Sequence, residues 1–467
     1  MRPRVGLLGL TLDLYARTSP EMLDGLRAFS GELRDTLRPV ADVDEAELAW
    51  DRLAIEKAVA RFDRDDVDLI VIVLLSYSTS LSAMPALLRT RKPLLIWNTQ
   101  RLREVGPGFG PDDITYNHGM HGVQDLCNVL LRHGREFHLI TGHYQDPAAV
   151  GKVHDLTRAA AAVRALRGRR IGLLGHTFDG MGDLYVDAST LLATTGVEVA
   201  HLSFAALARH LEAVLPEAVR VSMERDRQEF AIDPDVSEED HERSARLELA
   251  IRALIAEERL SALCALFTAA TDHPAIRTQP FLAVSKLLAE GFGYGGEGDP
   301  TSATAVMLMQ QLTKEANFAE MFTIDFAGGG VFMNHMAETN YRLGRPDLPV
   351  RLIRNAASFL PGEPSVCAFT VQKPGPVTLL NLTATAGGRL KMIGMCGEVA
   401  EWGPAPSVRT PHFMFRPRSA DGVEAFLTRY SLEGGSHHLA LGYGDQRGPL
   451  AAAARMMGIE WVEVTDL

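Results

Sequence analysis

The sequence predicts an α/β protein: two doubly wound, Rossmann-like α/β domains followed by a mainly antiparallel, β-rich C-terminal domain. Two observations lead to this prediction. Through roughly the first two thirds of the chain, short apolar runs alternate with longer amphipathic stretches, as in parallel sheets covered by helices. After about residue 317, short strand-like runs are separated by glycine pairs and triplets, which is typical of antiparallel sheets. We therefore predict domains at 1–168, 169–316 and 317–467.

The first domain begins with an apolar strand and then repeats strand and helix. Each expected strand is a short apolar run of the kind that a parallel sheet buries on both faces. Between these runs, apolar residues recur at helical spacing. The expected strands are Val5–Leu10, Leu69–Leu75, Pro93–Trp97 and Phe137–Thr141, and the expected helices include Glu21–Leu37 and Glu45–Phe62.

The central domain continues the same alternation. A basic cluster, Arg167–Arg170, precedes a new apolar run at Ile171–Leu174, which places the first domain boundary near residue 168. The segment Ser237–Asp240 has the form of a capping box and predicts a helix that starts there. Further strands are expected at Val197–Leu202 and Leu260–Phe267.

The C-terminal domain is expected to consist of short strands with glycine turns, closed by one helix and one strand. The turns are Gly328–Gly330, Gly387–Gly388 and Gly434–Gly435, and the strands include Val377–Leu382, Arg389–Ile393 and Leu439–Leu441. The closing helix and strand are Pro449–Met457 and Glu460–Val464.

Composition excludes several classes of protein. Lys and Arg total 47 against 59 Asp and Glu, and no segment gathers basic residues into a stripe, so we expect no nucleic-acid partner. The longest apolar run, Leu69–Leu75, is too short to cross a bilayer. The apolar run at the N-terminus is too short for a signal peptide, because Asp13 follows it at once. The scattered cysteines fit a reducing compartment. We expect a cytoplasmic protein without a membrane partner.

The segment Gly291–Gly296 has the letters of a dinucleotide-binding fingerprint, which would suit a nicotinamide-dependent oxidoreductase. That fingerprint requires a strand before the glycines and a helix packed against the third glycine. Here the preceding segment, Pro280–Glu290, has helical spacing instead. We therefore expect no nucleotide cofactor.

Glu297 stands between Gly296 and Gly298 and is followed by Asp299-Pro300, a typical helix cap and first helical position. Two interpretations stay open from the residues alone. The carboxylate is either held toward a ligand or is a surface acid stabilised by the helix dipole.

Glu320, His335 and the adjacent pair His437–His438 are further candidates. Two carboxylates with two imidazoles suit a divalent cation of borderline character, such as Mn2+ or Co2+. The alternative for each histidine is a purely structural role. Because neighbouring side chains of an extended segment point to opposite faces, we expect only one of His437 and His438 to face a metal.

The segments that carry these residues resemble the metal-site segments of L-arabinose isomerases, in the same order. They are Gly-Glu297-Gly-Asp, Phe-Ala-Glu320-Met-Phe-Thr, Asn-His335-Met-Ala-Glu and Gly-Gly-Ser-His-His438. In the N-terminal half, the similar segments are Lys92-Pro-Leu-Leu, Thr99-Gln100, Asn117–Gly122 and Thr141–Asp146. The resemblance spans roughly the whole chain.

The resemblance implies one divalent metal held by Glu297, Glu320, His335 and His438, with Glu297 and Glu320 as the proton-transfer residues. It also implies a homo-oligomer, a hexamer built from trimers, in which each active site receives His121 from a neighbouring subunit. The expected substrate-binding residues are His121, His118 in the same segment, and Tyr77 in the loop after the second strand. The alternative for the two histidines is capping of the helix through Val123–Leu131.

Departures from the family concern the sugar rather than the metal. The family carries Ser-Gln-His-Leu-Tyr where this chain has Leu10-Thr-Leu-Asp-Leu-Tyr15, and His118 replaces a glutamine. The substrate-lining loop Ser76–Met84 also differs. The predicted substrate is therefore L-arabinose or a related pentose or hexose, because the L-fucose isomerases are related to this family.

The predicted function is a metal-dependent aldose–ketose isomerase, an intramolecular oxidoreductase that uses Mn2+, Co2+ or another divalent cation. A metal on O1 and O2 of the sugar would polarise the carbonyl and stabilise an ene-diol, while two carboxylates transfer protons. A hydride shift would use the same ligands. The alternative is a catalytically silent sugar-binding or regulatory protein on the same scaffold, suggested by the altered sugar-contact segments.

Overall fold

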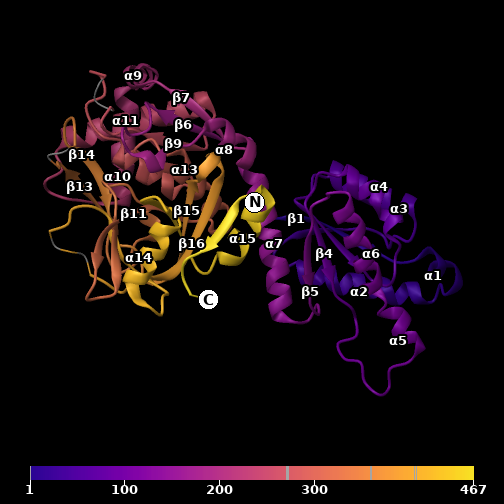
Figure 1. Cartoon of the computed structure of the whole chain (residues 1–467). Helices are drawn as coiled ribbons and strands as arrows, with labels where there is room; N and C mark the ends of the chain where they lie inside the picture. Colours follow the sequence, from indigo (N-terminus) through magenta and orange to yellow (C-terminus); the bar gives the residue numbers. More distant parts are fainter. Residues whose placement is uncertain (1, 270–272, 358–359, 404, 406, 467) are drawn as a thin grey trace. The chain divides into compact units, whose positions relative to one another are not determined.

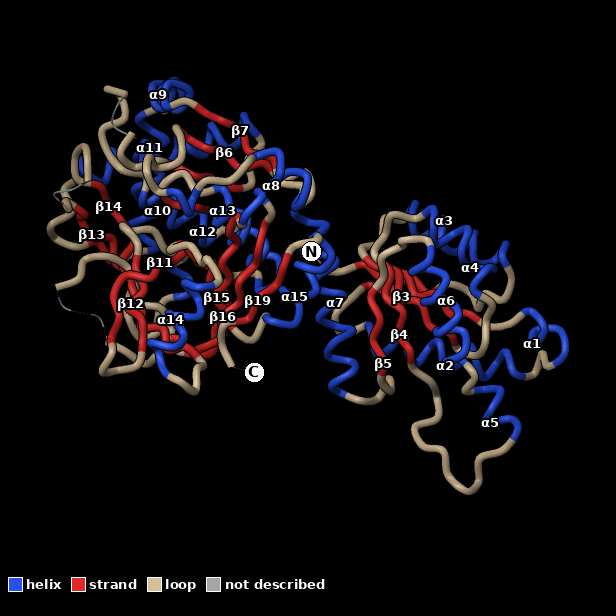
Figure 2. The backbone as a smooth tube through the Cα atoms, in the orientation of Figure 1, coloured by secondary structure: helices blue, strands red, loops and turns tan. Residues whose placement is uncertain are grey.

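The computed structural model describes residues 2–269, 273–357, 360–403, 405 and 407–466. The chain forms two compact units, residues 1–164 and 165–467, which we call the N-terminal and C-terminal units. Figures 1 and 2 show a sheet with covering helices in the N-terminal unit, and a helix-covered sheet beside a strand-rich part in the C-terminal unit.

The N-terminal unit is built on one parallel sheet with the strand order β2-β1-β3-β4-β5. Every residue of β3 is buried, so helices cover both faces of the sheet, as its continuous apolar run predicts. The strands are β1 (Arg4–Leu10), β2 (Asp42–Glu45), β3 (Leu69–Leu74), β4 (Leu94–Asn98) and β5 (His138–Thr141). The helices are α1 (Asp13–Thr18), α2 (Met22–Leu37), α3 (Arg52–Arg64), α4 (Ser80–Arg89), α5 (Pro111–Tyr116), α6 (Gly119–Arg132) and α7 (Pro147–Leu166).

One expected helix of this unit begins later than predicted. The prediction placed it at Glu45–Phe62, whereas Glu45 ends the edge strand β2 and α3 begins at Arg52. The cause is local, because the Asp51 side chain accepts a hydrogen bond from the N–H of Ala54 at 2.8 Å and so caps the helix there.

The C-terminal unit begins with a second parallel sheet of strand order β10-β9-β6-β7. Its helix α11 starts where the capping box predicts, with Ser237 Oγ accepting from the N–H of Asp240 at 3.1 Å. The strands are β6 (Arg170–Leu174), β7 (Glu198–Leu202), β9 (Ala262–Ala265) and β10 (Gly293–Gly296). The helices are η1 (Gly182–Leu184), α8 (Ala188–Thr195), α9 (Phe204–Ala213), α10 (Pro216–Glu229), α11 (Glu238–Glu258), α12 (Phe281–Ala289) and α13 (Pro300–Thr313).

Six further strands close into an antiparallel barrel of order β15-β18-β11-β12-β17-β16, in which β16 pairs back to β15. Strand β19 adds in parallel to β16, and α14 and α15 connect the later strands. The barrel elements are β11 (Ala316–Asp325), β12 (Gly330–Asn334), β15 (Gly375–Ala384), β16 (Leu390–Val399), β17 (His412–Pro417), α14 (Gly422–Leu432), β18 (His438–Tyr443), α15 (Arg447–Met457) and β19 (Glu460–Glu463).

Helix α13 lies between the parallel sheet and the barrel. It contacts β10 on one side and β11, β15 and β18 on the other. Its first ten residues are all buried, which is the environment of a helix that is covered all round. This helix therefore fixes the carboxyl end of β10 against the barrel strands.

A small third sheet, order β14-β13-β8, was not predicted and joins a short strand of the central segment to C-terminal strands. Its members are β8 (Ala231–Ile232), β13 (Arg351–Asn355) and β14 (Ser365–Phe369), and the short helices η2 (Tyr341–Leu343) and η3 (Ala386–Gly388) complete the unit. The predicted fold class, two parallel α/β sheets and an antiparallel β domain, is confirmed. The division into domains 1–168, 169–316 and 317–467 stays a prediction.

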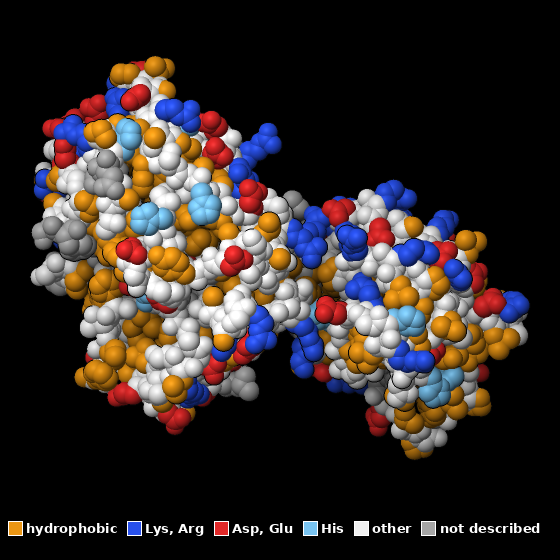
Figure 3. Space-filling view, turned by 45° about the horizontal axis from the view of Figure 1, so that its top comes forward, with side chains coloured by type: hydrophobic (Ala, Val, Ile, Leu, Met, Phe, Trp, Pro, Cys, Tyr) orange, Lys and Arg blue, Asp and Glu red, His pale blue; other side chains and the backbone are white. Residues whose placement is uncertain are grey.

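The surface agrees with the scattered charges of the sequence. On the face drawn in Figure 3, acidic and basic side chains are interspersed over each unit. Within the described ranges, no helix is both long enough and apolar enough to cross a bilayer.

Candidate functional site

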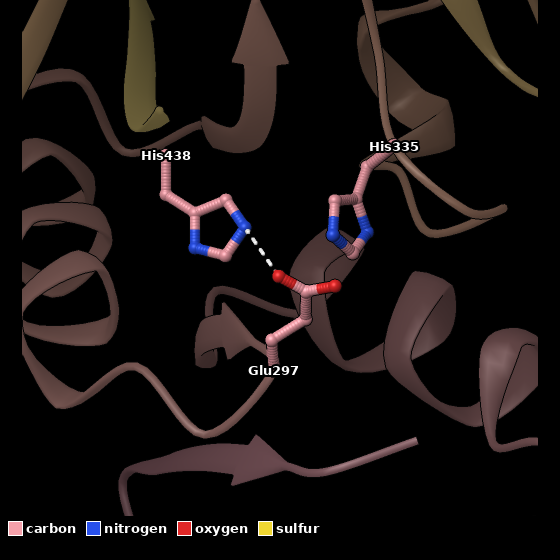
Figure 4. A group of neighbouring side chains, drawn as sticks. All are labelled: Glu297, His335 and His438. Atoms are coloured by element: carbon pink, nitrogen blue, oxygen red, sulfur yellow. Dashed lines mark ion pairs between the residues drawn. The ribbon is translucent and has the colours of Figure 1, made fainter. Parts of the chain in front are cut away.

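A group of buried carboxylates and imidazoles lies where the parallel sheet of the C-terminal unit meets the barrel. Figure 4 shows the carboxylate of Glu297 between the rings of His335 and His438. One ligand atom of each of these residues lies within 4.8 Å of the others. A second group, Glu320, His437 and His438, meets the same limit and shares His438 with the first. The structure thus brings together all the metal-site candidates of the sequence.

Glu297 follows β10 directly and adopts a left-handed backbone conformation with φ 55°. Its side chain is buried, which rules out a surface acid as its role. Glycine is required on both sides of it. An added Cβ at Gly296 would lie 2.7 Å from His335 Cε1, and one at Gly298 would lie 2.8 Å from Thr177 Cα. The loop therefore delivers the carboxylate into the group through close backbone packing.

His335 comes immediately after β12 and is oriented by a buried carboxylate. Its Nδ1 lies 2.8 Å from Glu338 Oε2, and Glu338 Oε1 accepts from the Tyr294 hydroxyl at 2.6 Å. Burial lowers the pKa of His335, but the charge and hydrogen bond of Glu338 outweigh it and raise this pKa to about 9. With Nδ1 held by Glu338, the ring presents Nε2 to the group.

His438 is the first residue of β18 and is oriented in the same way. Its Nδ1 lies 3.1 Å from Asp299 Oδ2. The other oxygen of Asp299 accepts from the N–H groups of Thr301 and Ser302 at 2.9 and 3.1 Å. Asp299 therefore caps α13, as the sequence predicts, and also fixes the second imidazole. Asn381 donates to the backbone oxygen of His438 at 2.9 Å and holds the strand end in place.

One nitrogen of each ring makes no hydrogen bond within the described part of the chain. His335 Nε2 and His438 Nε2 are buried and lack a hydrogen-bond partner among the described residues. The ring of Phe318 packs against both, with centroids 4.8 and 4.9 Å away. Buried polar atoms in native proteins are almost always satisfied. Two such nitrogens facing a carboxylate fit a divalent metal ion.

Glu320 lies in the middle of β11, opposite Asn334 of β12 and His438 of β18 in the sheet register. Directly opposite residues of antiparallel strands place their side chains on one face. Burial raises the pKa of Glu320 above its usual value. For Glu297, burial also raises the pKa, but the His437 hydrogen bond and the neighbouring imidazoles bring it below the usual value.

Both histidines of the pair turn a ring nitrogen toward Glu297, and that only His438 faces a metal directly stays a prediction. His437 Nε2 and His438 Nε2 lie 3.5 and 3.6 Å from the same oxygen, Glu297 Oε2. The alternation of side chains holds only within a strand, and β18 begins at His438, so His437 lies outside the regular pleat. Its Nδ1 lies 2.6 Å from Asp183 Oδ2, which turns the ring toward Glu297.

The expected substrate residues belong to the N-terminal unit and form a cluster of their own. His118 lies against Tyr77 and His121, with ring centroids 5.5 and 4.4 Å away, and its Nδ1 lies 3.2 Å from the Tyr15 hydroxyl. His118 occupies the N-cap position of α6 but makes no side-chain cap hydrogen bond. The capping alternative is therefore wrong for His118.

Sequence reasoning missed the carboxylates that orient the imidazoles. Glu338 stands three residues after His335, in a segment already singled out, so its proximity to a candidate ligand was the available signal. Asp183 lies 254 residues from His437 and carries no local signal. The glycine segment does not have the strand–loop–helix arrangement of a dinucleotide-binding fingerprint, because Gly293–Gly296 is strand β10 and follows helix α12.

Comparisons with known proteins point to one family. The model of the L-arabinose isomerase central domain matches residues 185–315, and that of the L-arabinose isomerase C-terminal domain matches residues 315–460. The two consecutive matches cover more than half of the chain.

Individual relatives extend the similarity to nearly the whole length. The chain is 29% identical to an L-arabinose isomerase of Nocardioides sp. over 405 residues, which cover 80% of this chain and 76% of the relative. It is 25% identical to one of Acidothermus cellulolyticus over 484 residues, covering 97% and 90%. It is 26% identical to one of Geobacillus kaustophilus over 399 residues, covering 81% and 77%.

Proposed function

The chain belongs to the L-arabinose isomerase family, and from this premise we propose that it is a metal-dependent aldose–ketose isomerase. The substrate is an aldose such as L-arabinose, or a related pentose or hexose, and the product is its 2-ketose. The observation that carries the proposal is a pair of buried nitrogens, His335 Nε2 and His438 Nε2, which lie beside the carboxylate of Glu297 and make no hydrogen bond with a described residue.

Glu297, Glu320, His335 and His438 would hold the metal. Two oxygen and two nitrogen donors suit Mn2+ or Co2+, cations that accept both kinds of ligand. When bound, the ion would act as a Lewis acid that polarises the carbonyl of the sugar. Glu338 and Asp299 would keep the two imidazoles oriented, because each holds an Nδ1 and leaves the Nε2 free.

Proton transfer is assigned to the two glutamates. Conversion of an aldose to a ketose removes the proton from C2, returns a proton to C1, and moves a hydroxyl proton between O2 and O1. Glu297 and Glu320 approach the group from different elements, the loop after β10 and the middle of β11. One carboxylate would take the C2 proton and the other would supply a proton, each contributing about 10²–10⁴-fold to the rate.

The test is ketose formation from a panel of pentoses and hexoses with added Mn2+. Turnover of at least one aldose, abolished in Glu297→Gln and Glu320→Gln, is the expected result. Sugar binding without turnover of any sugar would instead support the silent sugar-binding protein. Isomerising the active sugar in D2O distinguishes the ene-diol mechanism from a hydride shift. An ene-diol exchanges its carbon-bound proton with solvent, whereas a hydride shift does not.

We also propose that the enzyme is a homo-oligomer, a hexamer built from trimers, with shared active sites. His121 would bind sugar hydroxyls in the site of a neighbouring subunit, assisted by His118 and Tyr77. This role is supported by the exposed position of His121 in the cluster that it forms with His118 and Tyr77. Mixing inactive His121→Ala and Glu297→Ala subunits after dissociation should restore activity, since some sites then contain both native residues. Lack of any restoration in reassembled oligomers would contradict sharing.

A further inference from the structure

Three histidines of the C-terminal unit each have Nδ1 on a carboxylate and Nε2 near Glu297. Two of these pairs, Glu338 with His335 and Asp299 with His438, orient the proposed metal ligands. The third is Asp183 with His437, at 2.6 Å between Oδ2 and Nδ1. The same Asp183 oxygen also lies 3.3 Å from the backbone nitrogen of His437. Asp183 therefore constrains both the ring and the main chain of His437.

The loop that carries Asp183 is attached to the glutamate loop. The N–H of Phe178 donates to the backbone oxygen of Glu297 at 2.9 Å. The Thr177 hydroxyl donates to the backbone oxygen of Gly298 at 2.8 Å. The segment between β6 and α8 thus holds the backbone of Glu297 at one point and the ring of His437 at another. These contacts fix the relative positions of the two residues.

The third pair differs from the other two in its surroundings. The side chains of His335 and His438 are 2% and 0% exposed, and their Nε2 atoms make no hydrogen bond with a described residue. The side chains of His437 and Asp183 are 28% and 40% exposed. The Nε2 of His437 already lies 3.5 Å from Glu297 Oε2. His437 therefore stands at the solvent side of the group and contacts a carboxylate of the site.

We propose that Asp183 is a positioning residue of the isomerase, which holds the His437 imidazole so that its Nε2 faces Glu297 and the substrate's oxygens. The proposal rests on the proposed function. A carboxylate that accepts the Nδ1–H fixes the tautomer of an imidazole and prevents its rotation. Without Asp183, the partly exposed ring of His437 would be free to turn toward solvent. His437 is then lost as a hydrogen-bonding group for the reaction, while the metal ligands stay in place.

The test compares Asp183→Ala with Asp179→Ala, which removes an exposed carboxylate from the same loop. We expect Asp183→Ala to lower kcat by about tenfold to hundredfold, as is common for residues that orient a site histidine. The KM, and the affinity for Mn2+ measured by calorimetry, should change by less than about threefold, because the hydrogen bonds of the Asp183 carboxylate go to His437 and not to a proposed metal ligand. Added formate should restore part of kcat in Asp183→Ala, because it can occupy the vacated, partly exposed position. Asp179→Ala should behave as the native enzyme.

A measurement without turnover accompanies the kinetics. Modification of His437 by diethylpyrocarbonate, followed by peptide mass spectrometry, should be several-fold faster in Asp183→Ala than in the native protein or Asp179→Ala. If Asp183→Ala fails to fold, Asp183→Asn preserves the side-chain shape, and both a tenfold lower kcat and faster modification are expected for it.

Each contrary result is distinct. A kcat within twofold of Asp179→Ala would overturn the positioning role. A loss of Mn2+ affinity as large as that of His335→Ala would overturn it too, because His437 would then be a ligand. If the native protein isomerises no sugar, the proposed function fails instead. Modification of His437 at the native rate in Asp183→Ala would then overturn the positioning role separately.

Discussion

Replacing Gly298 by alanine tests how tightly the loop of Glu297 is packed. Gly298 has φ +75°, and an added Cβ would lie 2.8 Å from Thr177 Cα and closer still to the backbone oxygen of His176. Neither neighbour is the flexible end of a side chain, so the backbone itself has to move. Gly180, in the same β6–α8 loop, provides the control. It has φ +90°, but an added Cβ there would meet no described heavy atom within 4 Å.

The two variants share one energetic cost and differ in another. A left-handed conformation costs a residue with a Cβ about 1–2 kcal/mol in both cases. Overpacking against backbone adds about 1–3 kcal/mol for Gly298→Ala alone. At about 2 °C per kcal/mol for a large domain, the Tm of Gly298→Ala should lie about 2–6 °C below that of Gly180→Ala.

The displacement of this backbone should also lower kcat. The backbone of Gly298 adjoins Glu297, and a misplacement of about 1 Å at a reacting group costs about 10²-fold in rate. Thermal unfolding followed by calorimetry, with kcat on the active sugar, measures both effects. Equal Tm and equal kcat for Gly298→Ala and Gly180→Ala would refute this account of the loop.

Further expectations concern the metal and the ionisable groups. Chelation should abolish activity and lower the Tm, and Mn2+ at about one hundred times its Kd should restore about 2.7 kcal/mol of stability; unchanged activity after chelation would exclude a metal enzyme. His438→Ala should abolish Mn2+ binding in calorimetry, whereas His437→Ala should weaken it less. The reverse order would show that the assignment of His438 as the ligand is wrong. Glu338→Gln should weaken Mn2+ binding by about 10–100-fold, and native affinity would show that this carboxylate does not orient its histidine. The Arg447 hydrogen bond lowers the pKa of Asp445 from 3.8 to about 2, so its stabilisation is present above pH 3.8 and is lost as the pH falls toward 2. Asp445→Asn should therefore flatten the acid limb of unfolding in that range.

Local patterns predicted most of the fold. The apolar run at Leu69–Leu75 and its counterparts gave the parallel strands, because burial on both faces leaves a continuous signature. The polar edge strand β2 has no such signature and was not predicted, and the expected helix starts at its last residue, Glu45. The two-residue strand β8 is defined by its pairing with β13, which a local pattern does not contain.

The candidate site was predictable in its letters but not in its orientation. Glycines on both sides of Glu297 and the Asp299-Pro300 cap marked the loop, and the structure gives both features a steric or hydrogen-bonding reason. The direction of the His437 ring depends on Asp183, a residue distant in sequence, so strand alternation alone does not give that direction. The orienting role of Asp299 likewise depends on contact with the distant strand β18.

Helix α13 has a consequence for engineering. Its packing against β18 is close enough that an added Cβ at Gly442 would lie 2.7 Å from Met309 Cγ. The two family matches meet at residue 315, just beyond this helix, which makes that point an inviting junction for hybrids of two relatives. A hybrid joined there would place the helix of one parent against the barrel of another, where a single changed methylene costs about 1–3 kcal/mol. Recombination of this family should therefore inherit α13 and β18 from the same parent.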